Sequence, residues 1–209
     1  MKENMEFNFK YFQWRQELLE KIIRIIKKQP NSQGGTVLVG DSLVEQIPSS
    51  LLPADWINNG IGGMCSKPLC NLVDELVLQF NPQHVIIHLG TNDLGDTVME
   101  SPRDIVLNIG DLIMMIQANI PDISITLISI LPCIESKQSF MTTGGGIRTN
   151  AIIDVCNVEL KALAKHLQID YLDLNKHLRT GLEPKESYFS DGLHLNEHGY
   201  RLLMSKCSK

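Results

Sequence analysis

Apolar positions along the chain form short runs that alternate with segments of helical spacing. The runs are apolar or β-branched, as is typical of strands: Thr36–Val39, Trp56–Ile57, His84–Leu89, Ile123–Leu131 and Ile169–Leu172. Apolar residues spaced as on one face of a helix predict helices over Lys67–Phe80, Pro102–Ile120, Ile147–His166 and Asn196–Lys206. Strand and helix in alternation predict a parallel sheet that is covered on both faces. The expected fold class is therefore α/β, a three-layer α/β/α sandwich with right-handed crossovers.

One more helical pattern precedes the first strand. Apolar residues recur at helical spacing from Phe9 to Lys28, and Pro30 and Gly34 follow as helix-ending residues. An amphipathic helix with basic residues near its end could lie on a membrane surface. Packing of its apolar stripe on the protein is favoured, because helices of globular proteins are normally amphipathic for this reason. We therefore expect residues 1–30 to form a helix packed on a domain of residues 31–209. The stretch Thr142–Gly146 predicts a flexible loop within that domain.

Composition narrows the classes of partner. The chain has 209 residues, of which 43% are hydrophobic and 21% charged, with a net charge of −5. This size and composition suit one soluble domain, and the acidic balance argues against nucleic acid as a partner. No apolar stretch is long enough for stable membrane insertion.

Cysteine usage and the N-terminus bear on location. Five scattered cysteines without a CxxC pair predict neither a zinc site nor a disulfide framework, and favour reduced thiols. The polar start Met1–Glu6 is not that of a secretory signal. We expect a cytoplasmic protein.

Candidate chemistry follows the strands, as expected for open parallel sheets, which bind ligands beyond the carboxyl ends of their strands. The first run ends in Gly40-Asp41-Ser42-Leu43, so Ser42 lies at a turn where a helix begins. Free N–H groups at such a turn favour developing negative charge. Asp and Ser are also the usual helix caps, and this motif alone favours capping.

Two further junctions offer hydrogen-bond donors. The second run continues into Asn58-Asn59-Gly60-Ile61-Gly62-Gly63, whose glycines allow backbone to approach a ligand or simply form a turn. The third run continues into Gly90-Thr91-Asn92-Asp93, in which Asn92 is either an amide donor or a turn residue.

The fourth segment, Asp191-Gly192-Leu193-His194, lies near the C-terminus. A spacing of three lets the Asp191 carboxylate meet the His194 imidazole, fix its tautomer and leave the other nitrogen free to accept a proton. Such a pair alone is usually a structural hydrogen bond. Together the four segments supply a nucleophile, oxyanion donors and an oriented base, which are the parts of a hydrolytic serine site.

With these segments in place, the sequence resembles the SGNH (GDSL-type) hydrolases. Four blocks match in the family's order: Gly40–Leu43, Asn59–Gly63, Gly90–Asp93 and Asp191–His194. The resemblance runs from Thr36 almost to the C-terminus, and only the N-terminal helix lies outside it. The Gly-Ile-Gly-Gly block is most similar to the branch that includes the platelet-activating-factor acetylhydrolase catalytic subunits.

The resemblance implies a flavodoxin-like fold with five parallel strands and assigns the site. Ser42 would be the nucleophile, with Asp191 and His194 completing the triad. The oxyanion donors would be the Ser42 and Gly63 N–H groups and the Asn92 side chain. Gly63 is preferred to Gly62, because the family's glycine aligns with the second of the pair. No metal or cofactor is expected.

One departure concerns the pocket. The second block continues Met64-Cys65-Ser66, where relatives often carry Asp-Thr-Thr, which leaves the shape of the acyl or alcohol pocket open. Cys65 is interpreted as a small buried filler. His84 and His88 flank a buried strand, where packing or a core hydrogen bond explains them.

The expected function is that of a serine esterase or acylhydrolase that cleaves short-chain acyl esters, with a small-molecule ester as its substrate. Three alternatives stay open: an acyltransferase, a carbohydrate O-acetyl esterase using the same triad, and a catalytically silent ligand-binding relative. The intact Ser42, Asp191 and His194 argue against the last. A flavodoxin-like nucleotide binder is disfavoured, because the first glycine junction is too short to cradle phosphate. A homodimer is left open.

Overall fold

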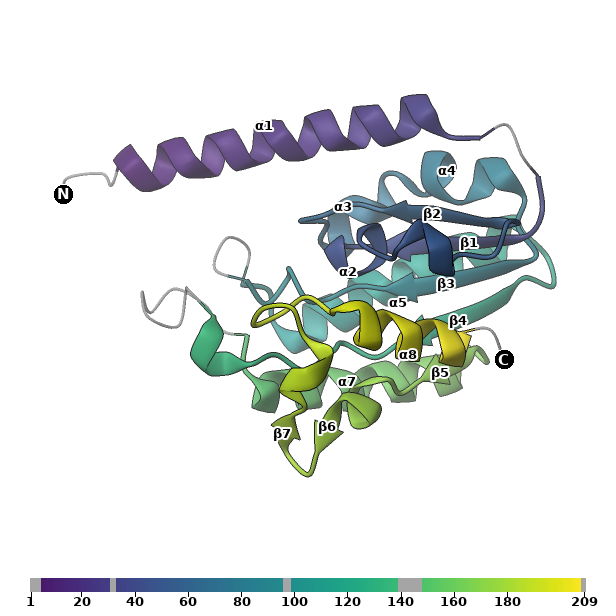
Figure 1. Cartoon of the computed structure of the whole chain (residues 1–209). Coiled ribbons are helices and arrows are strands. Elements are labelled where there is room, and N and C mark those ends of the chain that lie inside the picture. The colour runs from purple at the N-terminus through teal and green to yellow at the C-terminus, as the bar shows by residue number, and fades with distance from the viewer. Residues whose placement is uncertain (1–4, 31–32, 96–98, 139–147, 208–209) are drawn as a thin grey trace.

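A parallel sheet runs through the middle of the protein in the computed structural model (Figure 1). The structure describes residues 5–30, 33–95, 99–138 and 148–207, and for residues 5–12 and 14 the backbone alone. Five strands lie in the order β2-β1-β3-β4-β5. Their bounds are β1 Thr36–Gly40, β2 Trp56–Gly60, β3 His84–His88, β4 Ser124–Ile128 and β5 Asp170–Leu172. Neighbouring strands are all parallel, and the predicted five-stranded α/β fold is confirmed.

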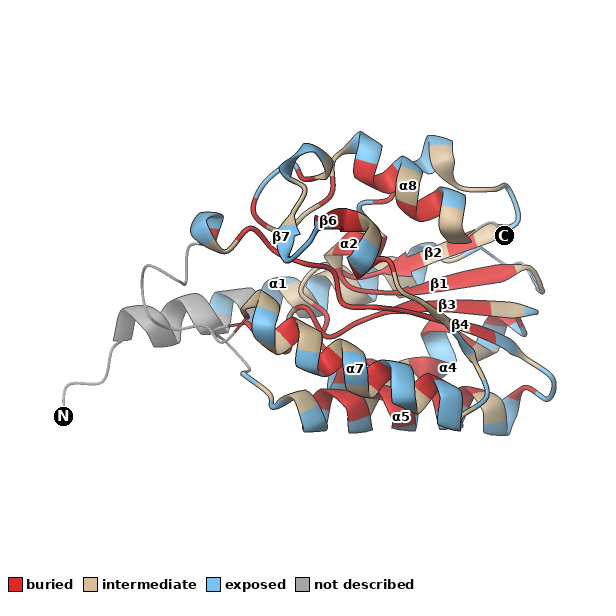
Figure 2. Cartoon of the chain, turned by 90° about the horizontal axis from the view of Figure 1, so that it is seen from below, coloured by how far each residue is buried: buried red, intermediate tan, exposed pale blue. Residues whose placement is uncertain are grey.

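Helices cover both faces of this sheet, as Figure 2 shows. One face carries α1 Met5–Lys28, α3 Ser66–Cys70, α4 Val73–Leu76, α5 Pro102–Asn119 and α7 Asn150–His166. The other face carries α2 Ser42–Glu45 and α8 Glu197–Cys207. Short 3-10 turns are η1 Ser49–Leu51, η2 Leu78–Phe80, η3 Glu135–Lys137, η4 Asn175–Leu178 and η5 Glu186–Tyr188. A small hairpin of β6 Arg179–Thr180 and β7 Glu183–Pro184 completes the described elements.

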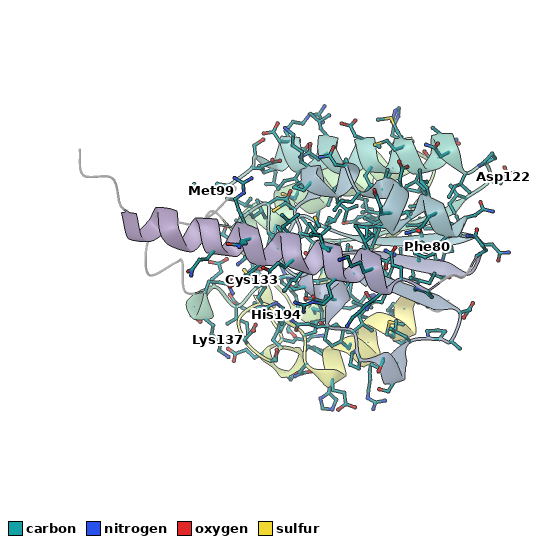
Figure 3. The ribbon with its side chains drawn as sticks, turned by 90° about the horizontal axis from the view of Figure 1, so that it is seen from above. Phe80, Met99, Asp122, Cys133, Lys137 and His194 are labelled. Atoms are coloured by element: carbon teal, nitrogen blue, oxygen red, sulfur yellow. The ribbon has the colours of Figure 1, made fainter. Side chains whose placement is uncertain are left out.

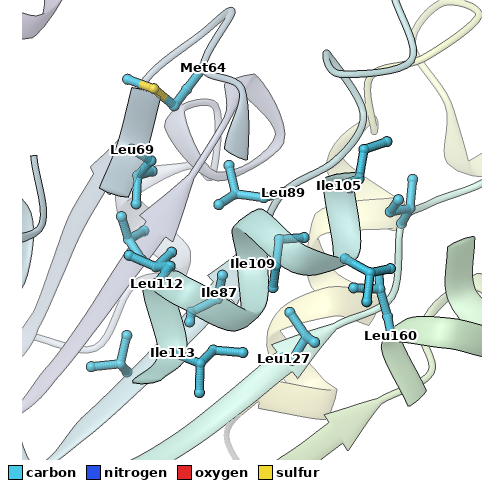
Figure 4. Close-up of a cluster of buried hydrophobic side chains, with 14 of the residues drawn as sticks. Met64, Leu69, Ile87, Leu89, Ile105, Ile109, Leu112, Ile113, Leu127 and Leu160 are labelled. Atoms are coloured by element: carbon cyan, nitrogen blue, oxygen red, sulfur yellow. The ribbon is translucent and has the colours of Figure 1, made fainter. Parts of the chain in front are cut away.

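Strand side chains alternate between two cores. Val39 and Ile87 belong to the larger core, while Leu38 and Ile86 belong to the smaller one under α2 and α8. Successive strand residues point to opposite faces, so a strand that is apolar throughout must be buried on both sides. In Figure 4, Ile87 of β3 and Leu127 of β4 meet side chains of α5 in the larger core.

The helix predicted over Lys67–Phe80 is wrong as a single element, because it divides into α3, α4 and η2. The Asn59 side chain on β2 donates to the Leu76 carbonyl at 2.7 Å. In a continuous helix that carbonyl would accept from Phe80 N–H, which bonds Val77 O instead. A side chain from a distant strand therefore ends the helix.

The strand predicted over Ile123–Leu131 is too long. It ends at Ile128, although the Ser129 N–H still donates to the Leu172 carbonyl of β5 at 3.0 Å. At Ile130 the chain leaves the sheet, because side-chain amides take both of its backbone groups. Asn157 of α7 accepts from Ile130 N–H at 2.8 Å and donates to Ile130 O at 2.9 Å, and Asn175 donates to the same oxygen at 3.0 Å. Elsewhere the predicted helices differ by a few residues at their ends, with α7 capped by Thr149. The predicted loop Thr142–Gly146 lies outside the described residues.

Helix α1 contains the helix predicted over Phe9–Lys28 and runs along one side of the body (Figure 1). Leu18, Ile22 and Ile25 pack against the larger core, while Leu19 and Ile23 are 57% and 43% exposed on another face. The division of the chain into this helix and a hydrolase domain stays a prediction. None of the described helices combines the length and apolar character that crossing a membrane requires.

Candidate active site

The four sequence blocks meet at the carboxyl edge of the sheet. Ser42, Gly63 and Asn92 follow β1, β2 and β3, which are adjacent strands of the sheet. The block containing His194 follows β5 by a longer path, and an antiparallel bridge between Phe189 and Leu195 closes its loop. Figure 3 shows His194 well away from Phe80 and Asp122, residues that precede strands. The fold thus places its candidate chemistry where parallel sheets bind ligands.

Ser42, His194 and Asp191 form a continuous hydrogen-bonded line. Ser42 Oγ lies 3.0 Å from His194 Nε2, although the residues are 152 positions apart in the sequence. His194 Nδ1 lies 2.8 Å from Asp191 Oδ2. With Nδ1 donating to the carboxylate, Nε2 presents its lone pair to the serine hydroxyl, the arrangement in which imidazole accepts a proton.

The Asp191 carboxylate is held by its own loop. Its Oδ1 accepts from the Leu193 N–H at 2.6 Å and the His194 N–H at 2.7 Å. Partial burial raises the pKa of Asp191, but the hydrogen bonds from His194 and Leu193 outweigh burial and hold the pKa below its usual value. Asp191 is therefore ionised at neutral pH and can stabilise a charged His194.

Ser42 begins the short helix α2 after a buried cap. Asp41 is fully buried, accepts from the Leu43 N–H at 2.9 Å and lies 3.3 Å from His88 Nδ1. Capping, expected from the motif alone, is thus present beside the nucleophile candidate. Among the described residues the Ser42 N–H meets no hydrogen-bond acceptor, which leaves it available to a ligand.

The glycine block turns so that two neighbouring amides have different surroundings. The Gly62 N–H donates to Glu45 Oε2 at 3.1 Å. Gly63 adopts a positive φ of 87°, which favours glycine, and within the described part of the chain its N–H has no acceptor. The free amide is therefore that of Gly63, the one that the sequence resemblance prefers.

Asn92 and Asp93 link the glycine block to the third block. Asn92 Nδ2 donates one hydrogen to the Met64 carbonyl at 3.0 Å, and an amide nitrogen carries a second. Asp93 Oδ1 accepts from the Ser66 N–H at 2.9 Å and from the Ser66 hydroxyl at 2.5 Å. Burial raises the pKa of Asp93 to about 6, despite these bonds. This pairing holds Asn92 beside the turn that carries Gly63.

The remaining candidates are structural. Cys65 is 4% exposed, and burial is the main reason that the pKa of its thiol is raised. The nearby carboxylates of Asp93, Glu100 and Asp41 raise this pKa further. The thiol is therefore protonated and unreactive. His84 Nε2 lies 2.9 Å from the Thr126 hydroxyl, in keeping with a core hydrogen bond. In the described part of the chain no three His, Cys, Asp or Glu side chains gather in a group that could hold a metal ion.

Three residues in contact with the site blocks were missed in the sequence. Glu45 holds the Gly62 amide, and Gln138 and Arg148 contact the loops of His194 and Asn92. None of the three belongs to a block or has a telling spacing. Only their contacts across the fold reveal them.

Comparison with known proteins gives the family. Residues 30–202 match the GDSL-like Lipase/Acylhydrolase family. A protein from Streptococcus pneumonia, provisionally described as a platelet activating factor, is 24% identical with a TM-score of 0.82, over 96% of this chain and 97% of that one. A GDSL-like lipase from Bacteroides thetaiotaomicron is 21% identical with a TM-score of 0.74, over 95% of both chains. An acetyl xylan esterase is 21% identical with a TM-score of 0.66, over 83% of this chain and 98% of that one.

At these identities the similar structures share the fold with this chain. No curated protein matches the sequence. The family match covers all four blocks and most of the chain. The chain belongs to the GDSL-like lipase/acylhydrolase family.

Proposed function

We propose that the protein is a serine esterase that cleaves short-chain acyl esters through an acyl-enzyme on Ser42. The observation that carries the proposal is the line from Ser42 Oγ to His194 Nε2, at 3.0 Å, and from His194 Nδ1 to Asp191 Oδ2, at 2.8 Å. A hydroxyl, a base and a carboxylate that orients the base are the three roles of a serine hydrolase. Family membership supports ester chemistry at this site.

In the first half of the reaction, Ser42 Oγ attacks the ester carbonyl carbon as His194 Nε2 accepts the hydroxyl proton. The carbonyl π electrons move to oxygen, and a tetrahedral intermediate forms. His194 then gives the proton to the alcohol oxygen as the carbon–oxygen bond breaks, which leaves the acyl group on Ser42.

In the second half, water attacks the acyl-enzyme while His194 Nε2 accepts one of its protons. When this second intermediate breaks down, the proton returns to Ser42 Oγ and the carboxylic acid leaves. Throughout, Asp191 accepts the Nδ1 hydrogen and stabilises the imidazolium that forms. The depressed pKa of Asp191 supports this role, because the carboxylate is ionised at neutral pH.

We assign the oxyanion donors to the Ser42 N–H, the Gly63 N–H and the second hydrogen of Asn92 Nδ2. Among the described residues the two backbone N–H groups have no acceptor, and Asn92 Nδ2 uses only one of its two hydrogens. They come from three adjacent strand ends, so they can converge on one oxygen. Donors fixed in advance stabilise the developing charge without reorganisation.

The acyl part is proposed to be short, and acetyl in particular. An acetyl xylan esterase and an acetyl-xylooligosaccharide esterase are among the similar folds, which favours a carbohydrate O-acetyl ester as a second candidate substrate. Transfer of the acyl group to an alcohol uses the same acyl-enzyme, with the alcohol in place of water. The cytoplasmic location and the absence of a nucleic-acid partner stay predictions, and a homodimer stays open.

The test is hydrolysis of p-nitrophenyl esters from acetate to palmitate by the wild type, Ser42→Ala and the control Ser205→Ala. Ser205 is an exposed serine whose hydroxyl bonds the Leu202 carbonyl in α8. We expect activity on short chains that is lost in Ser42→Ala and kept in Ser205→Ala. Activity that persists in Ser42→Ala would contradict the proposal.

Two further arms separate the candidates. Acetylated xylooligosaccharides are offered to the same variants, and released acetate is measured. A competing alcohol is added in the second arm, and ester products are separated from free acid. Faster acetate release from the oligosaccharide than from p-nitrophenyl acetate favours the carbohydrate esterase, and an ester product that dominates over acid favours the acyltransferase.

A further inference from the structure

We propose that Arg148 and Gln138 form a clamp that sets the position of the His194 loop relative to the Asn92 loop. Both residues are far in sequence from Ser42, Asp191 and His194. We assign them as positioning residues, which act through the loops that they hold. The inference rests on the proposed function for its catalytic meaning. Its structural part can be tested separately.

Three hydrogen bonds of equal length build this Arg148–Gln138 clamp. Arg148 Nη1 donates to the Thr91 carbonyl, and Arg148 Nη2 donates to Gln138 Oε1, both at 2.8 Å. Gln138 Nε2 donates to the Gly192 carbonyl, also at 2.8 Å. Both side chains are 6% exposed, so the bonds are shielded from water. Bonds from a charged donor are stronger than neutral ones, and burial increases their strength.

The two ends of the clamp are the peptides that carry the site. The Thr91 carbonyl belongs to the peptide that leads into Asn92. The Gly192 carbonyl belongs to the peptide whose N–H, that of Leu193, donates to Asp191 Oδ1 at 2.6 Å. Gln138 therefore holds one side of a peptide plane while the other side holds the triad carboxylate. A rotation of this plane would move Asp191, and with it the His194 ring.

Close contacts around Gly192 fix the position of the loop that contains Asp191 and His194. The Gly192 carbonyl also accepts from the Ile134 N–H at 2.9 Å. A Cβ atom on Gly192 would lie 2.6 Å from Gln138 Nε2 and 2.8 Å from Lys137 Cβ, closer than such atoms approach. The loop is thus pressed against the segment that carries Gln138. This contact gives a physical reason for glycine inside the Asp191–His194 block.

The geometry has a catalytic consequence because the base and the oxyanion donors come from opposite sides of the site. Asn92 follows β3 at the centre of the sheet, whereas His194 follows β5 at its edge. The distance between them is set by whatever joins the two loops. Catalytic groups must lie within about 0.5 Å of their productive positions, and a shift of about 1 Å can lower turnover roughly a hundredfold.

The test uses Gln138→Glu, which is nearly isosteric. The variant keeps an oxygen to accept from Arg148, but it replaces the donor to the Gly192 carbonyl with a second oxygen. The new carboxylate pairs with the buried guanidinium, so the protein should fold. Arg148→Met is the second variant, because it removes the other end of the clamp.

Arg179→Met is the matched control. Arg179 is also a buried arginine, 8% exposed, with bonds to Asp154 at 2.9 Å and Asn150 at 3.0 Å. It contacts neither the Thr91 peptide nor the Gly192 peptide through these bonds. Loss of stability from removing a buried arginine should therefore appear in both arginine variants, and loss of positioning only in the clamp variants.

Two readouts are measured on each protein: hydrogen exchange at the Leu193 and His194 amides, and kcat and KM for the best ester. We expect faster exchange at both amides, a kcat that falls roughly ten- to hundredfold and a KM within about twofold of the wild type in Gln138→Glu and Arg148→Met. Arg179→Met should leave amide exchange, kcat and KM near their wild-type values, after correction for the folded fraction.

The outcomes decide separately on the clamp and on the proposed function. Unchanged amide exchange in Gln138→Glu would overturn the clamp, whatever the activity. Faster exchange with unchanged kcat in an active enzyme would overturn its positioning role. If the wild type shows no Ser42-dependent hydrolysis while exchange responds as expected, the proposed function fails and the clamp stands.

Discussion

At the scale of single residues, the Asp191 and Asp93 carboxylates differ in how fully their oxygens are hydrogen-bonded. Asp191 uses both oxygens, bonding two backbone amides and the His194 ring. Asp93 is fully buried, and only its Oδ1 is hydrogen-bonded to described residues. The pKa of Asp191 is accordingly lowered, whereas burial raises that of Asp93 to about 6. The same functional group is thus a stable anion in one place and close to neutralisation in the other.

Asp93 should make stability depend on pH. Its folded pKa of about 6 lies above the ordinary value of 3.8, so the folded state binds the proton more tightly than the unfolded state does. Stability from this group is therefore present at acid pH and falls as pH rises between the two values. We expect Asp93→Asn, which cannot ionise, to lack this fall. Urea unfolding of both proteins between about pH 4 and about pH 7 measures it, and a difference that is constant with pH would contradict the expectation.

Asn92 should matter to turnover far more than to folding. Asn92→Ala removes the proposed donor to the oxyanion, and loss of one such donor typically costs about 2.7–4 kcal/mol, or roughly a hundredfold or more in kcat. The control is Gln117→Ala, which removes another half-buried amide, one that donates from α5 to the Leu167 carbonyl at 3.1 Å. Steady-state kinetics of both variants, on the ester that the wild type hydrolyses best, give the kcat values to compare. Near-normal kcat in a folded Asn92→Ala protein would refute the role.

The residues that could be predicted from the sequence share one property: each lies in a short motif directly after a strand or near the chain end. Ser42, Gly63 and Asn92 follow strands, and Asp191 and His194 share one loop, so the four motifs together, with the family resemblance that they carry, selected these residues. Gln138 and Arg148 carry no such signal. They contact the site from segments 10 residues apart on either side of a stretch that the structure does not describe. Side-chain contacts of this kind follow from the fold and not from the pattern.

At the scale of elements, long-range amide side chains decide where helices and strands end. Apolar spacing predicted both the helix over Lys67–Phe80 and the strand over Ile123–Leu131. Asn59 ends the first by taking the Leu76 carbonyl, and Asn157 ends the second by pairing with Ile130. A hydrophobic pattern reports which positions are buried, but it does not report which backbone groups are already bonded. The existence of most elements was therefore predictable, and some of their bounds were not.

Asn157→Leu tests this at the end of β4. The substitution keeps the size of the side chain but removes the acceptor and the donor that pair with Ile130. Because a buried backbone group left without a partner costs about 1–3 kcal/mol, we expect a fall of that order in the free energy of unfolding. Asn119→Leu is the control, since Asn119 is exposed and bonds only Met115 O of its own helix among the described residues. Equal effects in the two variants would contradict the interpretation.

At the scale of the whole molecule, layers and sheet were predictable because alternation of strand and helix leaves few topologies. The sequence predicted that α1 packs against the rest of the protein. It did not predict which face of the helix makes this contact. The structure sets Leu18, Ile22 and Ile25 against the larger core and leaves Leu19 and Ile23 exposed. Both stripes are apolar, so the sequence alone offers two equivalent faces.

Neighbouring isoleucines give a matched test of how α1 docks. Ile22→Ala removes side-chain atoms that pack on the core, whereas Ile23→Ala removes atoms of the same kind from an exposed position. We expect Ile22→Ala to lower the free energy of unfolding by about 1 kcal/mol and Ile23→Ala to change it by less than about 0.5 kcal/mol. Chemical unfolding of the full chain measures both. A larger effect at Ile23 would show that the other face of the helix is the docked one.

The order in which the site residues occur along the chain has a consequence for biosynthesis. Ser42 is translated 152 residues before His194, and the two must meet for the proposed nucleophile to be activated. At about 5–20 residues per second, the ribosome adds His194 roughly 8 to 30 seconds after Ser42. During that interval the nascent chain carries the serine without its base. The proposed triad is therefore incomplete until the segment of Asp191 and His194 has emerged from the ribosome.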